Sequence, residues 1–400
     1  MNRLALFLYS ILFSLISIPS LMAQNTANYD ETKVPDLILP DPFVSFRGKS
    51  IQTIQDWESI RRPEILQLFE ENVYGKIPTD FDAITFKEVS ESQNPYPDKA
   101  ILKEVDITVS RNGNTHTMRL NVFIPKSGKG PFPVFMLINY KPKDPTEKLV
   151  EEGFWTVSEL IDRGYATASF HGETVSPDDK IRFSEGVIGN LYPEHLAQAD
   201  GLRTLGAWGW GAMRAMDYFV HEASIDEKRA ILVGHSRAGK AALWASANDT
   251  RWAVTIPNES GCGGAALSKR KFGETVQVIN TSFPHWFNDN FKAFNGKEEL
   301  LPLDQHMMVS LIAPRAIYFS SAREDRWADP KGEYLSMQLG SRIFSDIYGE
   351  KVSFPVEFES LKGPVLQSFA GYHIREGEHN LTWEDWSHYV DFVELQWNKK

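Results

Sequence analysis

A serine stands between small residues at the centre of the stretch ILVGHSRAGKAALWASA, residues 231–247. The apolar block before it predicts a buried strand, and the alanine-rich run after it predicts a helix. A serine at such a strand-to-helix turn projects its hydroxyl from a strained backbone, and small neighbours give the clearance that the turn needs. Gly234 and Ala238 occupy the two small positions of the Gly-x-Ser-x-Gly pattern, and Gly239 follows. The pattern predicts that Ser236 is a nucleophile.

A serine hydroxyl becomes a good nucleophile only when a base takes its proton, so we looked for a histidine that a carboxylate could orient. In the chain order of hydrolases with such a turn, the histidine comes last. His379, in the loop-like stretch REGEHNLTWEDW, fits that order. His373 lies in an expected strand and His388 in an expected terminal helix, so both are weaker candidates. We expect His235 to point to the other side of the turn and to support it structurally.

Two carboxylates are candidates for the acid that orients the histidine. Glu259 follows the apolar run RWAVTIPN, at the tip of the strand after the serine turn. Asp325 ends the next expected strand, AIYFSSARED, which is where most hydrolases of this type carry the acid. Either could reach the imidazole, and each could instead organise a loop or pair with a nearby arginine. The residues alone leave both open.

The elements that must position these residues alternate between strands and helices. The apolar runs FPVFMLINY, YATASFHG, AILVGHS and WAVTIPNES are separated by stretches with helical spacing, which is the pattern of a parallel sheet. Before them, Asn112 and Gly113 separate two alternating runs and predict a hairpin. Without internal repeats or low-complexity linkers, we expect one α/β-hydrolase domain over residues 24–400. It would hold a doubly wound, mostly parallel sheet between helices, a three-layer sandwich with an extended N-terminal arm.

Residues 1–23 have the features of a secretory signal peptide. A basic start is followed by an apolar run and by a small-residue ending at Ala23. The apolar run is short for a membrane-spanning helix and is broken by serine and proline. We therefore expect cleavage near Ala23, a secreted or periplasmic protein, and no membrane association afterwards.

Composition excludes several classes of partner. The formal net charge is −11, with acidic and basic residues mixed along the chain, so nucleic acids and anionic membranes are not expected to bind. The single cysteine, Cys262, cannot form an internal disulfide. No zinc-ligand spacing and no calcium loop occurs, and we expect no metal and no other cofactor. Eleven tryptophans permit a carbohydrate ligand. We expect a monomer.

The stretch GHSRAGKAALWASANDTRWAVTIPNESGCGGAAL resembles the signature of the glucuronoyl esterases, bacterial type. In that family a Gly-x-Ser-Arg-x-Gly-Lys turn is followed by Glu-Ser-Gly-x-Gly-Gly. Further similar stretches are LGAWGWGAMRAMDYF, SFPHWFNDNF, LPLDQHMMVSLIAPRAIY, EDRWADPKGEY and GEHNLTWEDW. The resemblance covers about residues 200–395 and, more loosely, the chain from residue 55. It implies an α/β-hydrolase that cleaves esters between lignin alcohols and 4-O-methyl-glucuronic acid side groups of glucuronoxylan.

The resemblance also implies roles for individual residues. It favours Glu259 as the acid of the triad, with Asp325 as the alternative that some bacterial members carry. Arg237 would help to hold the oxyanion, Lys240 would contact the sugar, and Trp327 would face the uronate. Outside the resemblance, Arg237 and Lys240 could be surface charges at a helix start, and Trp327 could belong to the core.

The chain departs from the family pattern after FPVFMLINY, where NYKPKDPTEK stands in place of a loop close to Asn-Phe-x-Gly-Asn. The second oxyanion donor is therefore not identified. His285, Trp286 and Asn290 are neighbours of the region that would read the sugar hydroxyls. Two alternatives stay open: an acetyl-xylan or general carboxylesterase on the same fold, and a carbohydrate-binding protein that has lost catalysis. The intact serine, histidine and glutamate set opposes the second.

Overall fold

The computed structural model describes residues 27–90, 92–141 and 153–397. The expected signal peptide therefore lies outside the described residues, as does most of the NYKPKDPTEK stretch after Tyr140. Within the described part of the chain, no helix is both long and apolar enough to cross a membrane.

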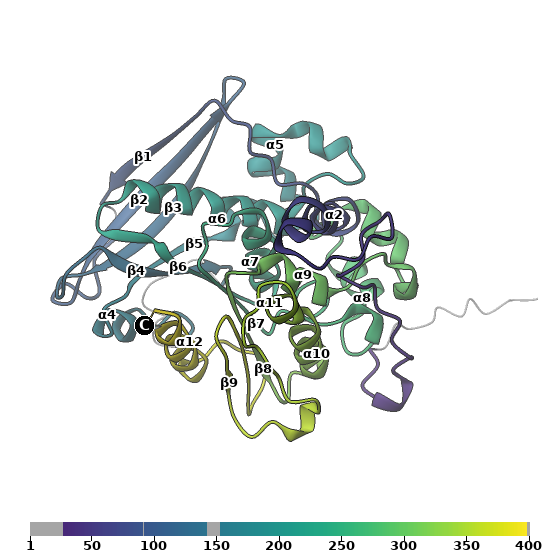
Figure 1. Cartoon of the computed structure of the whole chain (residues 1–400). Coiled ribbons are helices and arrows are strands. Elements are labelled where there is room, and N and C mark those ends of the chain that lie inside the picture. Colours follow the sequence, from purple (N-terminus) through teal and green to yellow (C-terminus); the bar gives the residue numbers. More distant parts are fainter. Residues whose placement is uncertain (1–26, 91, 142–152, 398–400) are drawn as a thin grey trace, which may run out of the picture.

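A single mixed sheet runs through the described structure, in the order β1-β2-β3-β5-β4-β6-β7-β8-β10-β9 (Figure 1). Its strands are β1 (Ala83–Val89), β2 (Ala100–Arg111), β3 (Asn114–Pro125), β4 (Phe132–Asn139), β5 (Ala166–His171), β6 (Ile225–His235), β7 (Val254–Asn258), β8 (Ala316–Ala322), β9 (Val365–Leu366) and β10 (Ala370–Arg375). The run from β5 to β10 is parallel, whereas β1, β2 and β3 add an antiparallel edge and β9 pairs antiparallel with β10.

Helices pack on both faces of the sheet. They are α1 (Ile54–Asp56), α2 (Arg62–Phe69), α4 (Val157–Asp162), α5 (Val187–Leu191), α6 (Thr204–His221), α7 (Arg237–Asn248), α8 (Val276–Ser282), α9 (Gln305–Ile312), α10 (Pro330–Gly340), α11 (Arg342–Asp346) and α12 (Trp383–Trp397). Helices α6, α7, α9 and α10 bury their apolar sides in one core cluster, and α4 and α12 bury theirs in another across the sheet (Figure 1). The predicted helix–sheet–helix layering is confirmed.

The hairpin predicted at Asn112 and Gly113 joins β2 to β3. Both residues have positive φ, 54° and 79°, as a two-residue turn between twisted strands requires. In the following register, Arg111 pairs with Asn114 and Ala100 with Pro125. The two turn residues thereby set the pairing register of β2 and β3, the longest strands of the sheet.

Most tryptophans belong to the core, as their large apolar area favours. The fully buried ones are Trp57, Trp155, Trp208, Trp210, Trp244, Trp252 and Trp386. Trp327, in contrast, is 41 % exposed and is therefore not a core residue.

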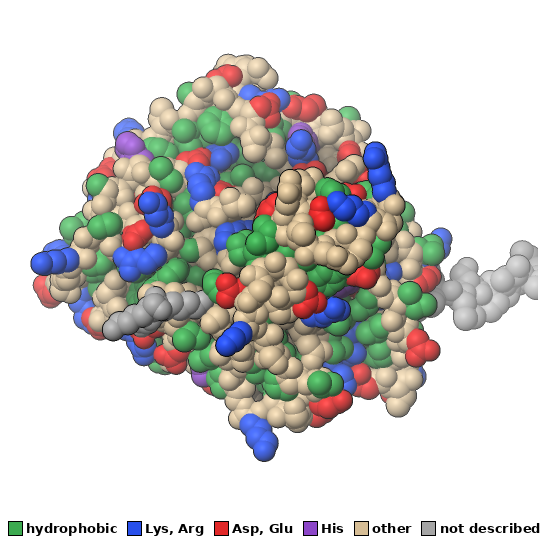
Figure 2. Space-filling view, viewed as in Figure 1, with side chains coloured by type: hydrophobic (Ala, Val, Ile, Leu, Met, Phe, Trp, Pro, Cys, Tyr) green, Lys and Arg blue, Asp and Glu red, His purple; other side chains and the backbone are tan. Residues whose placement is uncertain are grey.

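The first residues of the described chain, here called the arm (residues 27–33), pack against the rest of the protein (Figure 1). Asn28 forms an antiparallel bridge with Gly273, and Glu31 pairs with Arg270 at 2.8 Å. Gly273 has a φ of +61°, and a Cβ there would come within 2.4 Å of the Trp327 carbonyl oxygen. The arm therefore lies against the segments that carry Gly273 and Trp327. On the face seen in Figure 2, acidic and basic side chains are interspersed.

Candidate active site

Four neighbouring strands place the candidate residues at one edge of the sheet. Ser236 directly follows β6, and Glu259 directly follows β7. Asp325 comes three residues after β8, and His379 comes four residues after β10. Because these strands are parallel neighbours, their carboxyl ends meet at the same edge, which is where open α/β sheets bind ligands.

Ser236 sits on a strained turn between β6 and α7. Its φ of 56° and ψ of −125° are sparsely populated for a residue with a side chain. A Cβ at Gly234 would come within 2.2 Å of the Ala238 carbonyl oxygen, and one at Gly239 would come within 2.9 Å of the Gly234 carbonyl oxygen. Glycine is thus needed at 234 and 239. Position 238, which is glycine in the simple pattern, accepts alanine.

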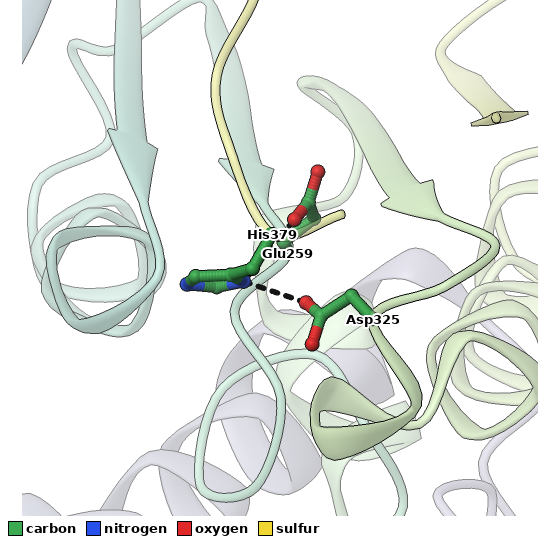
Figure 3. Close-up of side chains that lie close together, drawn as sticks. All are labelled: Glu259, Asp325 and His379. Atoms are coloured by element: carbon green, nitrogen blue, oxygen red, sulfur yellow. Dashed lines mark hydrogen bonds and ion pairs between the residues drawn. The ribbon is translucent and has the colours of Figure 1, made fainter. Parts of the chain in front are cut away.

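His379 has two carboxylate partners (Figure 3). Its Nδ1 lies 2.6 Å from Asp325 Oδ2 and 3.1 Å from Glu259 Oε2. Burial alone would lower the pKa of His379, but hydrogen bonds and charge interactions with the two carboxylates raise that pKa to about 9. The His235 ring lies 4.4 Å from the His379 ring and contacts Tyr140 on a parallel plane. His235 therefore packs against the candidate base, whereas it was expected to point to the other side of the turn.

Glu259 is buried, and besides His379 it contacts the arginine Arg375 and a backbone N–H. Its Oε1 accepts from Arg375 at 2.7 Å, and its Oε2 accepts from the Asn380 N–H at 3.0 Å. Burial raises the pKa of Glu259 to about 7, and the neighbouring His379 and Arg375 act in the lowering direction. Like Ser236, Glu259 has a positive φ, here 44°, directly after its strand.

Among the residues that the structure describes, the same three side chains form a group whose geometry could hold a metal ion. One ligand atom each from Glu259, Asp325 and His379 lies within 4.8 Å of the others. Arg375, however, contacts Glu259 from 2.7 Å, and its permanent charge opposes a cation at this position. The arrangement fits a histidine held by carboxylates better than a metal centre.

Ser236 and His379 open into one cavity of about 210 Å³. The cavity is lined by Ser236, Arg237, Lys240, Glu259, Gly261, Glu274, Phe283, Trp286, Trp327, Ala328 and His379. The structure thus brings together the serine, histidine and glutamate candidates with the three residues that the resemblance assigned to oxyanion and sugar contacts. Asp325 joins them through its bond to His379. Asn290 does not belong to this lining; its amide donates to the Glu71 carbonyl at 2.8 Å.

The two cations of the cavity are anchored and are not free surface charges. Lys240 is buried, and its Nζ donates to the Ser260 carbonyl at 2.6 Å and contacts Glu274 Oε2 at 3.4 Å. Arg237 forms an ion pair with Asp178, and its guanidinium carbon lies 4.7 Å from the Trp286 ring centre and 4.9 Å from that of Tyr140.

The sequence analysis missed several residues around the cavity. Glu274 lies in KRKFGETV and Asp178 in SPDDK, and neither stretch has a pattern that points to a site. Arg375 ends strand β10 and showed no signal either. A buried carboxylate that lines the same cavity as the candidate serine could be found only once the loops were placed.

A serine on a strained turn and a histidine bound to carboxylates, at the carboxyl edge of a parallel sheet between helices, define a carboxylic ester hydrolase of the α/β-hydrolase fold. A family model described as glucuronyl esterase, fungi, matches residues 107–348. The chain belongs to the glucuronoyl esterase family.

Individual relatives agree with this assignment. A carbohydrate esterase from an unknown prokaryotic organism is 36 % identical over 398 residues, which covers 92 % of this chain and 91 % of the relative. A solved glucuronoyl esterase from Solibacter usitatus is 34 % identical with a TM-score of 0.84, covering 92 % of this chain and 100 % of that one. A promiscuous esterase from a marine bacterial metagenome is 36 % identical with a TM-score of 0.81, covering 92 % and 99 %.

Proposed function

We propose that this chain is a serine esterase that cleaves esters of glucuronic acid through an acyl-enzyme, with Ser236 as nucleophile and His379 as base. One observation carries the proposal. Ser236, on its strained turn, and His379, bound by two carboxylates, line the same cavity as two anchored cations and the exposed Trp327.

The first chemical step is proton transfer from Ser236. Because Nδ1 of His379 faces the carboxylates, Nε2 is the nitrogen left to accept the serine proton; Figure 3 shows this end of the ring pointing away from both acids. Asp325 makes the shorter contact and accepts the hydrogen bond from Nδ1–H, the place for which the resemblance favoured Glu259. Glu259 adds a second negative charge, which stabilises the imidazolium while the serine oxygen attacks the ester carbonyl.

The attack produces a tetrahedral oxyanion that needs donors already in place. Arg237 occupies the position directly after Ser236, at the start of α7, where backbone N–H groups have no partner within the helix. Its N–H and its permanently charged guanidinium can both stabilise the oxyanion. The alcohol then leaves with the proton that His379 returns, and water, activated by the same histidine, releases the acid and restores Ser236.

The polar lining favours a sugar acid as the acyl group. Lys240 Nζ has three donors, of which the Ser260 carbonyl and Glu274 engage two, so one remains for a sugar oxygen. Glu274 offers acceptors for hydroxyl groups, and the exposed Trp327 ring offers an apolar face. The model of the family to which the chain belongs is described as glucuronyl esterase. We therefore propose esters between lignin alcohols and the glucuronic acid side groups of glucuronoxylan as the substrate.

The proposal is tested with benzyl glucuronate beside an acetyl ester, using the wild type and Ser236→Ala. We expect the wild type to release benzyl alcohol and glucuronate, and Ser236→Ala to lose this activity while keeping its fold, as judged by circular dichroism. A wild type that cleaves only the acetyl ester would contradict the substrate, and an active Ser236→Ala would contradict the nucleophile.

A general carboxylesterase is the second candidate, because a similar solved protein, 36 % identical, is described as promiscuous. Measuring kcat/KM for both esters on the same preparation separates the two candidates. A glucuronate ester preferred by about tenfold or more, roughly 1.4 kcal/mol of transition-state binding, supports the first candidate.

We further propose a secreted, monomeric protein whose single hydrolase domain begins after Ala23. Mass spectrometry of the exported protein and light scattering test the cleavage site and the monomer.

A further inference from the structure

Asp178, in the loop between β5 and α5, collects three donors from two other parts of the chain. Its Oδ1 accepts from the Trp286 indole at 2.6 Å and lies 2.9 Å from His285 Nε2, and its Oδ2 binds Nη1 of Arg237. The carboxylate thereby ties the start of α7, directly after the nucleophile, to the loop whose Trp286 lines the cavity.

We propose that Asp178 is a positioning residue that holds the Arg237 guanidinium by one end, so that its Nε–H is presented to the oxyanion formed at Ser236. The proposal rests on the esterase function proposed above. Asp178, which does not line the cavity, would orient the Arg237 guanidinium, the main charged donor to the oxyanion.

The remaining contacts of Arg237 restrict its orientation further. The guanidinium carbon lies 4.7 Å from the centre of the Trp286 ring, 4.9 Å from that of Tyr140 and 5.4 Å from that of Phe283. Trp286 and Phe283 stack on each other with ring centres 3.8 Å apart and planes within 3°. Flat rings of this kind restrain a planar guanidinium without using its hydrogen-bond donors.

One donor of Arg237 is left over. Nε is buried and has no hydrogen-bond partner within the described residues, although the side chain lines the cavity with Ser236. A buried unpaired donor is costly unless a ligand engages it. An oxyanion that forms only in the transition state is such a ligand. The unpaired Nε–H therefore destabilises the resting enzyme, and its hydrogen bond to the oxyanion stabilises the transition state.

Asp178 also has the charge that this task requires. Burial alone would raise its pKa, but the bond to His285, the charge of Arg237 and the Trp286 indole lower the pKa to about 2. The residue is therefore ionised at any working pH. A neutral amide at this position would keep an acceptor for Trp286 but would lose the charge that anchors Nη1.

The experiment compares Asp178→Asn with Arg237→Ala and with the double variant. Asp289→Asn is the matched control, because Asp289 also pairs with an arginine, Arg203 at 2.9 Å, and does not line the cavity. Values of kcat and KM are measured separately with benzyl glucuronate and with p-nitrophenyl acetate, since a tetrahedral oxyanion forms from both. A wild type that cleaves only the acetate disproves the glucuronate substrate but leaves this comparison intact.

We expect Asp178→Asn to lower kcat by about 10-fold to 100-fold on both esters, less than the ~100-fold to 1,000-fold typical of removing an oxyanion donor, with KM within about threefold. In the Arg237→Ala background, Asp178→Asn should alter kcat by less than about twofold, because the guanidinium that Asp178 positions is absent. Asp289→Asn should match the wild type.

Two results would overturn the proposal. One is a kcat within about twofold of the wild type in Asp178→Asn, and the other is an equal loss in the presence and absence of Arg237, which marks a purely structural role. If Asp178→Asn does not fold, Trp286→Phe replaces it. This variant keeps an aromatic ring beside the guanidinium and removes one donor to Asp178, and it must show the same dependence on Arg237.

Discussion

His379 Nδ1 lies 2.6 Å from Asp325 Oδ2 and 3.1 Å from Glu259 Oε2, so a single imidazole is bound by acids from the ends of two neighbouring strands. The two acids differ in their other partners. Glu259 also binds Arg375, which neutralises part of its charge. The two carboxylates should therefore contribute unequally to catalysis.

Removing the acids one at a time tests this inequality. We expect Asp325→Asn to lower kcat on benzyl glucuronate by about 100-fold and Glu259→Gln by about 10-fold. The double variant should approach the ~10,000-fold loss seen when a triad histidine loses its only acid. If Glu259→Gln alone is as damaging as the double variant, Glu259 is the sole acid and Asp325 only organises its loop.

The raised pKa of His379 predicts an alkaline pH profile. The base must be neutral to accept the serine proton, so kcat/KM should fall as the pH drops through a value near 9, the pKa of His379 in the free enzyme. In Asp325→Asn one stabilising anion is lost, and the acidic limb should move down by about one unit or more. Profiles of kcat/KM from pH 5 to 10 measure the acidic limb of the wild type and that of the variant. An acidic limb that does not move in the variant would show that a group other than His379 controls it.

Strain at Ser236, the proposed nucleophile, predicts the order of stability of two variants. Ser236→Ala keeps a Cβ at a φ of 56°, whereas Ser236→Gly removes it. Relief of strain worth ~1–3 kcal/mol, less the ~0.4–1 kcal/mol of extra freedom that glycine gives the unfolded chain, should leave Ser236→Gly more stable than Ser236→Ala by about 1 kcal/mol. Urea unfolding of the two inactive variants gives this difference directly. A Ser236→Gly variant that is less stable than Ser236→Ala, by the ~0.4–1 kcal/mol that glycine's freedom alone costs, would mean that the turn is unstrained.

The buried pair of Lys240 and Glu274 predicts a pH-dependent loss of stability. Lys240→Met leaves Glu274 unpaired, at a cost of about 3 kcal/mol near pH 8. Burial already raises the pKa of Glu274, so the carboxyl of the variant should bind a proton in acid. The deficit should therefore be small near pH 4 and grow as the pH rises through that raised pKa.

A double variant, Lys240→Met with Glu274→Gln, is the control for this prediction. The double variant removes the Glu274 charge that Lys240→Met leaves unpaired. It should therefore recover much of the free energy of unfolding that Lys240→Met loses at pH 8. A deficit that is equal at both pH values, and unchanged in the double variant, would indicate lost packing instead of an unpaired charge.

Local signals in the sequence were enough to predict the sheet and the strand-end residues. The serine turn, the Asn112–Gly113 hairpin and the last loop histidine each depend on a few adjacent residues, and parallel topology does the rest by bringing strand ends together.

Residues that act through loop packing could not be predicted in this way. Asp178 meets Arg237 across 59 residues of sequence, and Glu274 meets Lys240 across 34. Neither carboxylate stands at a strand end or within a repeating pattern, so only tertiary packing pairs each with its cation. The residues alone left the choice between Glu259 and Asp325 open, because both follow adjacent strands. The resemblance favoured Glu259, and in the structure both carboxylates reach the imidazole.

The docking of the arm has a practical consequence for attaching the protein to a surface. An affinity tag or anchor placed ahead of Asn28 would emerge beside the segment that carries Trp327, at the rim of the cavity. The far end of α12 behaves differently, because Trp397 shares a hollow with Phe132 and Tyr165, at the amino ends of β4 and β5 and thus at the opposite edge of the sheet. Immobilisation through the C-terminus therefore leaves the entrance of the cavity accessible, whereas an N-terminal tether would crowd it.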